Sequence, residues 1–244
     1  EEQTPVKIDS SILKRILAKT SFSMASQDVR YYLNGMLLEM DGSRINGVAT
    51  DGHRLAFSSS KTSTTTQETR NILPRKAVLE LSKLLSPEHE EIELLIGPSY
   101  VDVRSTNLSF SSKLIDGKYP DYDKVFPTGE PLPLEISKEI LQSALSRASV
   151  LSNEKYRGVR FQLSPNKLKL TANNPEQESA EEELEVVYSG PELEVGFNIG
   201  YLLDVLNSID GDSVNFEFYG EDSSCIIKEK GSEDDVYVIM PMRL

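Results

Sequence analysis

The chain has 244 residues and a mass of 27.3 kDa, with 38% hydrophobic and 27% charged residues, a composition that excludes a disordered chain and a disulfide miniprotein. The formal net charge of −13 argues against attraction of the whole surface to nucleic acid or to anionic lipid. No apolar run approaches the ~20 residues of a membrane span, no basic leader opens the chain and Cys225 has no cysteine to pair with, so we expect a cytoplasmic protein.

Two amphipathic helices are expected in the first half of the chain. Residues 10–20 form the first, with Ser10 or Ser11 as the cap, and residues 74–85 form the second, with Pro74 at its start. Their apolar stripes consist of Ile12, Leu13, Ile16 and Leu17, and of Ala77, Val78, Leu81, Leu84 and Leu85. Short strands divided by Asp-Gly and Gly-Pro-Ser turns are expected at residues 36–40, 44–50, 54–58, 92–96, 101–104 and 108–114.

The second half runs through the same order of elements, which indicates an internal duplication. Residues 137–148 correspond to the first helix and residues 198–209 to the second, with strands at 158–163 and 168–172 between them. We therefore predict two similar α+β domains, 1–122 and 123–244, each of antiparallel sheets with two helices on one face.

The basic residues are distributed unevenly between the halves. Through Asp123 there are 15 Lys and Arg against 17 Asp and Glu, a net of −2, whereas the remainder has 11 against 22, a net of −11. Six bases lie on the predicted helices of the first half, away from the apolar stripes: Lys14, Arg15, Lys19, Arg75, Lys76 and Lys83. These bases either form a surface that binds a polyanion or are ordinary solvent-exposed residues of a helix.

Signatures of enzyme chemistry are absent. The sequence has no phosphate-binding loop, no dinucleotide fingerprint, no zinc-protease motif and no nucleophile elbow. Of the two histidines, His89 lies in an acidic loop and His53 follows the Asp51-Gly52 turn between two apolar strands. Because no nucleophile stands at a recognisable spacing from His53, a simple hairpin end is the plainer interpretation of this segment.

Two further segments suggest binding. The loop at residues 27–35 carries Arg30 beside Tyr31 and Tyr32, which can stack on bases or instead fill a seam between domains. The chain ends in an apolar strand followed by Met240-Pro241-Met242, and methionines serve both in cores and on adaptable binding surfaces.

Taken together, six ordered segments resemble the β sliding clamp of bacterial DNA polymerase III. They are residues 29–35, 49–56, 116–122, 151–160, 172–178 and 240–244, so the resemblance covers essentially the whole chain. The family has three similar domains in each protomer, and this chain resembles the second and third. It lacks an initiator methionine, and we expect it to be a fragment without the family's first domain.

The resemblance implies a DNA clamp fold and a processivity factor without catalytic activity, cofactor or metal. In the family, a ring-shaped homodimer encircles duplex DNA independently of sequence, with helices inside and sheets outside, and tethers the replicative polymerase. An acidic exterior and basic channel would fit the net charge. Because the ring closes between the first and third domains, we expect this fragment to be monomeric.

The resemblance also assigns two sets of residues. Duplex DNA would contact Gln27, Arg30, Tyr31, Tyr32, Arg75 and Lys76. A hydrophobic pocket for short linear motifs of polymerase subunits, the clamp loader and repair proteins would consist of Leu33, Thr50, Gly52, His53, Arg54, Leu55, Pro120, Val125, Asn198, Tyr201, Ser224, Val238, Met240, Pro241, Met242 and Arg243. Lys124 departs from the arginine that the family pattern leads us to expect, which removes planar bidentate pairing.

Two alternative functions stay open on the sequence. One is an enzyme that uses His53 and a nearby carboxylate in a cleft between domains, which would lose turnover in His53→Ala. The other is a two-domain scaffold with no role on DNA, in which neutralising the six helix bases would change nothing.

Overall fold

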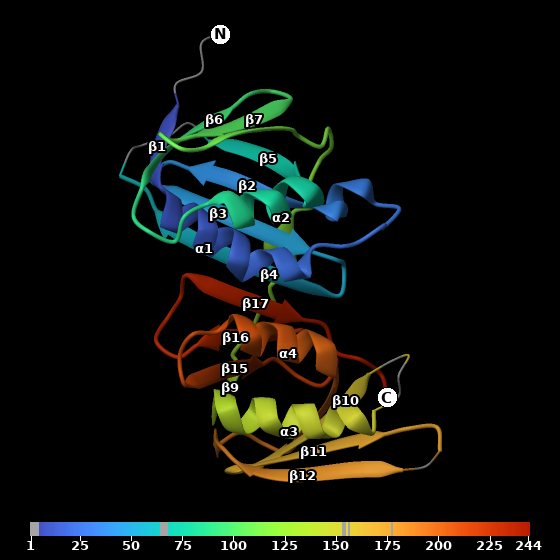
Figure 1. Cartoon of the computed structure of the whole chain (residues 1–244). Coiled ribbons are helices and arrows are strands. Elements are labelled where there is room, and N and C mark those ends of the chain that lie inside the picture. Colours follow the sequence, from blue (N-terminus) through green and yellow to red (C-terminus); the bar gives the residue numbers. More distant parts are fainter. Residues whose placement is uncertain (1–4, 64–67, 153–154, 156, 177) are drawn as a thin grey trace. The chain divides into compact units, whose positions relative to one another are not determined.

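The computed structural model describes residues 5–63, 68–152, 155, 157–176 and 178–244. The chain folds into two compact units, Glu1–Pro120 and Asp121–Leu244, each described by itself below (Figure 1). Of the resemblance segments, Asn153, Glu154, Tyr156 and Gln177 lie outside the described residues. No helix in the described part of the chain is long and apolar enough to cross a membrane.

The first unit contains two α-helices, α1 (Ser10–Thr20) and α2 (Arg75–Leu84), and two short 3-10 helices, Ser21–Ser23 and Tyr31–Asn34. Its strands are β1 (Val6–Asp9), β2 (Gly35–Asp41), β3 (Arg44–Thr50), β4 (Arg54–Lys61), β5 (Thr69–Pro74), β6 (Glu91–Ile96), β7 (Tyr100–Arg104) and β8 (Ser109–Lys113). All pair antiparallel, in the orders β1-β6-β7-β8 and β4-β3-β2-β5.

The core of the first unit forms where the two helices cover the sheets. Helix α1 packs on β3 and β4, and α2 packs on β2 and β5, so that the helices lie side by side (Figure 1). Leu13, Ile16 and Leu17 of α1 are completely buried, as their helical spacing predicts. They join residues of both sheets in a single hydrophobic cluster, which fixes the ends of β3 and β4 against a rigid base.

The second unit contains α3 (Lys138–Val150), α4 (Ile199–Ser208) and a 3-10 helix at Tyr122–Val125. Its strands are β9 (Leu132–Ser137), β10 (Gly158–Ser164), β11 (Lys167–Asn173), β12 (Ser179–Glu185), β13 (Val187–Tyr188), β14 (Leu193–Asn198), β15 (Ser213–Phe218), β16 (Cys225–Glu229) and β17 (Asp235–Ile239). They pair antiparallel in the orders β12-β11-β10-β14 and β13-β9-β15-β16-β17.

Aromatic side chains fill the core of the second unit. Phe161 and Phe197 meet edge to face with ring centroids 5.2 Å apart, and Phe216 stacks on Phe218 at 5.9 Å. All four rings are at most 1% exposed. Aromatic pairs in these geometries add stability beyond their buried area, so both sheets of this unit are held to one core.

The predicted duplication is confirmed in the order of strands and in matching hydrogen bonds. The first residue of each leading helix, Ser10 or Lys138, donates its backbone N–H over 2.8 Å to the carbonyl that precedes the strand after the second helix, Glu90 or Asp212. The α+β architecture predicted from the sequence is therefore present in both units, with two antiparallel sheets and two helices in each.

Three details of the predicted helices were wrong. Helix α1 is capped by Asp9, whose carboxylate accepts the backbone N–H of Ser11 at 2.8 Å, and not by Ser10 or Ser11. Lys19 is only 7% exposed because a lysine can bury its methylene stem along a helix. Leu84 is 52% exposed because α2 ends there.

Candidate functional site

The turn between β3 and β4 is held by hydrogen bonds to two side chains. Gly52 has a φ of +90°, which favours glycine, and precedes His53 at the start of the return strand. One Asp51 carboxylate oxygen accepts the backbone N–H groups of His53 and Arg54, at 2.8 and 3.1 Å. The Thr50 hydroxyl donates to the carbonyl of Arg54 at 2.6 Å and accepts from Gly52 N–H at 3.1 Å. This turn is therefore a rigid platform.

Arg54 is fixed on three sides. Its Nε lies 3.2 Å from Asp51 Oδ2, its Nη2 donates to the carbonyl of Phe22 at 2.8 Å, and its guanidinium lies 5.8 Å from the centre of the Phe22 ring. Only 12% of the Arg54 side chain is exposed. A guanidinium held in this way keeps one orientation and does not need to be ordered when a ligand binds.

Sequence reasoning missed Tyr119, whose hydroxyl contacts the backbone of β3 next to this turn. The Thr50 N–H donates to the Tyr119 hydroxyl at 3.1 Å, and the hydroxyl donates to the carbonyl of Val48 at 3.3 Å. Tyr119 is 5% exposed, and this burial raises the pKa of its phenol. The signal was available, because Tyr119 lies within the 116–122 segment of the resemblance and directly precedes Pro120.

The other first-unit residues assigned to partner binding are apolar or solvent-facing. Leu33 and Leu55 are buried, Pro120 is partly buried and the His53 side chain is exposed. Beside His53 the Asp51 carboxylate already accepts backbone N–H groups, and among the described residues no serine or cysteine side chain is hydrogen-bonded to the His53 ring.

The loop assigned to DNA is braced by an ion pair. Arg30 donates to both oxygens of Asp28, at 3.0 and 2.8 Å, and also to the carbonyl of Asp51 at 3.2 Å. The Arg30 hydrogen bonds lower the pKa of the Asp28 carboxyl to about 2. Tyr31 is 56% exposed and meets Tyr32 edge to face at 5.6 Å. Gln27 is exposed and has a φ of +58°.

Most bases of the two first-unit helices have hydrogen-bond partners. Lys14 donates to the carbonyls of Ser82 and Leu85 at 3.0 and 2.7 Å, at the end of α2. Arg75 donates to the carbonyls of Met24 and Ala25, both at 3.4 Å, and Lys83 pairs with Glu80 at 3.0 Å. Lys76 is exposed, and no other described residue pairs with it. The charges remain, but their positions are largely fixed.

In the second unit, several assigned residues lie at the start of α4, on the chain's last strand and in the tail that follows it. Asn198 caps α4 by accepting the N–H of Tyr201 at 3.2 Å. Val238 of β17 is buried and Met240 is 39% exposed, whereas Arg243 is exposed and has no ion-pair partner among the described residues. Ser224, Val125 and Pro241 are partly buried. Lys124 pairs with Asp121 at 3.0 Å.

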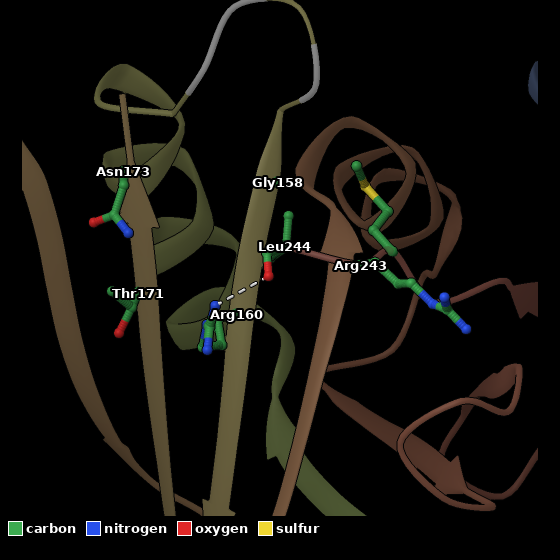
Figure 2. Close-up of a pocket in the computed structure, with 7 residues that line it drawn as sticks. Gly158, Arg160, Thr171, Asn173, Arg243 and Leu244 are labelled. Carbon is green, nitrogen blue, oxygen red and sulfur yellow. Dashed lines mark hydrogen bonds between the residues drawn. The ribbon is translucent and has the colours of Figure 1, made fainter. Parts of the chain in front are cut away.

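The tail that carries these methionines also borders a pocket of about 350 Å³ within the second unit (Figure 2). The tail is attached to β14, because the Met242 N–H donates to the carbonyl of Gly196 at 2.7 Å. The pocket is lined by Gly158, Arg160, Thr171, Asn173, Met242, Arg243 and Leu244. Met242 and Arg243 thus belong both to the assigned partner site and to this pocket.

Comparison with known proteins identifies the family. Residues 7–121 match the family model for the DNA polymerase III beta subunit, central domain, and residues 123–243 match that for its C-terminal domain. The chain belongs to the beta sliding clamp family.

Individual clamps agree with this assignment over the whole chain. The beta sliding clamp of Pseudomonas aeruginosa is 47% identical over all of this chain and 68% of the relative, and that of Escherichia coli K12 is 45% identical over 67% of the relative. A crystal structure of the P. aeruginosa sliding clamp superposes with a TM-score of 0.97 at 46% identity, covering 100% of this chain and 68% of that one. The chain thus spans about two thirds of the length of these clamps.

A second P. aeruginosa clamp structure, bound to griselimycin, matches equally well, with a TM-score of 0.97 and 46% identity. Beta clamps are non-catalytic polymerase subunits, so the enzyme alternative built on His53 is set aside. The comparisons do not bear on the role of any single residue, and the site residues named above stay predictions.

Proposed function

We propose that this chain acts as the central and C-terminal part of a DNA polymerase III processivity factor that surrounds duplex DNA and tethers the polymerase through short peptides. The match of the two family models across residues 7–121 and 123–243 carries this proposal. The chain would catalyse no reaction itself, since a clamp works by keeping the polymerase near its template. The compartment is then the bacterial cytoplasm, where replicating DNA lies.

Partner binding is assigned to the preorganised turn at residues 50–55 and to the methionine tail. The turn supplies fixed polar groups and the tail supplies apolar surface, and this combination suits a peptide with apolar anchors. The exposed Met240 lets one surface adapt to several partner sequences, because its unbranched side chain can repack.

Duplex DNA is assigned to the exposed residues of the 27–32 loop and to the start of α2. Sequence-independent attraction needs positive charge near phosphates and no reading of bases. Arg75 and Lys76 occupy the first turn of α2, and Lys76 is the more exposed. The ring-shaped homodimer of the full-length protein and the monomeric state of this chain stay predictions, which sedimentation would decide.

The first test is a titration of a fluorescently labelled peptide that carries the polymerase's clamp-binding motif, followed by anisotropy. Saturable binding that is lost in a Met240→Ala, Met242→Ala double variant would support the proposal. A folded wild-type chain that binds no such peptide would contradict it. Val187→Ala is a suitable control variant, because Val187 is 67% exposed and outside the assigned residues.

A further inference from the structure

The pocket beside the tail lies on the solvent face of the sheet β12-β11-β10-β14. Side chains alternate between the two faces along a strand. Val159, Phe161 and Leu170 are completely buried in the core, so Gly158, Arg160 and Thr171 face the other way. At about 350 Å³ the pocket falls in the size range of sites that take small ligands or single side chains, which begins at ~300 Å³.

Its apolar wall is Leu244, which rests on two glycines. A Cβ atom added to Gly158 would overlap Leu244 Cδ2, and one added to Gly196 would lie 2.8 Å from Leu244 Cδ1 and 2.5 Å from the carbonyl oxygen of Met242. Only bare backbone admits the tail this closely. Leu244 nevertheless stays 53% exposed, so it offers apolar surface to something else.

The opposite wall carries polar groups with unused hydrogen-bonding capacity. Thr171 and Asn173 follow each other on one face of β11 (Figure 2), and neither side chain makes a hydrogen bond with another described residue. Arg160 differs, because it pairs with Glu194 and donates to the carbonyl of Leu244 at 3.5 Å. The charge of Arg160 is therefore already balanced, and Thr171 and Asn173 remain available to a ligand.

A positive charge stands at the border of the pocket. The Arg243 side chain points away from Arg160 (Figure 2), is exposed and has no ion-pair partner among the described residues. Arg243 lies between Met242 and Leu244 in the chain, so a ligand that spans the methionine tail and the pocket passes close to this residue. An acidic group is complementary to it.

We propose that this pocket extends the peptide site and holds the residues that flank a partner's clamp-binding motif. One apolar flanking side chain lies against Leu244 and Gly158, the peptide backbone accepts and donates hydrogen bonds at Thr171 and Asn173, and a neighbouring acidic residue meets Arg243. The proposal rests on the proposed function. Its occupant follows from continuity, since Met242 and Arg243 are shared with the assigned site, and from the unpaired charge of Arg243.

The experiment compares two labelled peptides by anisotropy, one with the core motif alone and one extended at either end by an apolar residue and an aspartate. The extended peptide should bind the wild-type chain about five- to tenfold more tightly at the favoured end, as one or two net hydrogen bonds allow. In a Thr171→Val, Asn173→Ala double variant this ratio should fall to what the contacts with Leu244 and Arg243 alone contribute, while the affinity for the core peptide is unchanged. Ser164→Ala, on the same face of β10 but outside the pocket lining, should keep the ratio.

Replacing the flanking aspartate by lysine should weaken binding, and more so at low salt. Equal affinity for core and extended peptides at both ends in the wild type would overturn the inference and leave the proposed function standing. Failure of the core peptide itself to bind would overturn both. A double variant that changed self-association in sedimentation, with peptide affinities unaltered, would instead assign the pocket to a second copy of the chain.

Discussion

Tyr119 holds the end of β3 in place through a single buried hydroxyl. That hydroxyl accepts the N–H of Thr50 and donates to the carbonyl of Val48. Tyr119→Phe would take from the buried Thr50 N–H the hydroxyl that accepts its hydrogen bond, and we expect a loss of about 1–3 kcal/mol in the free energy of unfolding. Denaturant titration measures it.

Tyr100→Phe provides the matched control for this substitution. Tyr100 is 42% exposed, and its hydroxyl makes no hydrogen bond to another described residue. Its loss should change stability by no more than about 0.5 kcal/mol. Equal effects of the two variants would show that the Tyr119 hydroxyl does not support the turn.

The Asp28–Arg30 ion pair gives the 27–32 loop a dependence on pH. Because the folded-state pKa of Asp28 is lowered to about 2, the stabilisation of the loop is complete above the ordinary aspartate value of about 3.9 and is lost as the pH falls through about 2. Carboxyl NMR titration should find a midpoint near the lower value. An Arg30→Gln variant should raise the midpoint toward the ordinary value of about 3.9, because it removes the guanidinium and keeps the backbone N–H that Asp28 also accepts. A wild-type midpoint already at the ordinary value would contradict the bracing of the loop.

At this scale, short-range chemistry was predictable and long-range pairing was not. The Asp51-Gly52 turn was predictable because the aspartate side chain accepts nearby backbone N–H groups and glycine tolerates a positive φ. The cap was expected at Ser10 or Ser11 and is Asp9. A carboxylate and a hydroxyl can both accept the first N–H groups of a helix, so the residue types alone did not decide between these neighbours. The support of Thr50 by Tyr119 joins residues 69 positions apart, and no local pattern reports such a contact.

Helix α1 lies directly on the backbone of β3 at Gly47. A Cβ atom added there would overlap Ile16 Cγ2, and Ile16 is completely buried. We expect Gly47→Ala to destabilise the first unit by about 1–3 kcal/mol, as overpacking of a filled core does. Thermal or denaturant unfolding measures this cost.

Gly117→Ala tests whether the cost comes from the core contact. The added methyl would meet mainly the exposed Tyr31 ring, at 3.2 Å, which can move aside. A change within about 0.5 kcal/mol is expected. If Gly47→Ala were equally mild, α1 would not be packed as tightly on β3 as the structure has it.

Among the elements, the helices were predictable because their apolar residues recur at a period that no strand shares. The bounds of α1 agree with the prediction at both ends, and β3 likewise. Strands β1 and β5 were not predicted, because Val6–Asp9 and Thr69–Pro74 are short and carry charged and polar residues. Their pairing partners β6 and β2 place them in the sheets.

The charge of the whole molecule bears on its binding to DNA. A lysine without a carboxylate partner gains most from contact with a phosphate. Lys76→Ala should therefore make the negative slope of log affinity against log salt shallower by about 0.9, the value for one phosphate contact. Lys83→Ala, which removes a base already paired with Glu80, should change the slope less. Affinities for one duplex, measured between about 50 and 200 mM salt, decide this. Identical slopes for Lys76→Ala and the wild type would remove Lys76 from the DNA surface.

The architecture of each unit and its duplication could be predicted because the order of helices and strands is repeated in the sequence. The partner-site residues came from the resemblance, since binding walls made of Leu33, Pro120 or Val238 look like ordinary core from composition alone. The pocket beside the tail had no signal at all. It depends on two glycines from different strands, Gly158 and Gly196, that lie under one leucine.

In both units a lysine side chain donates to the backbone carbonyl just after the second helix, but the two lysines stand at different places in their helices. Lys14 donates to Leu85 in the first unit, and Lys138 donates over 2.7 Å to Ile209, the corresponding residue of the second. An alignment of the two copies pairs Lys138 with Ser10, four residues before Lys14. The two halves thus share this contact although their lysines stand at different aligned positions, and a count of lysines at aligned positions would understate how alike the two halves are.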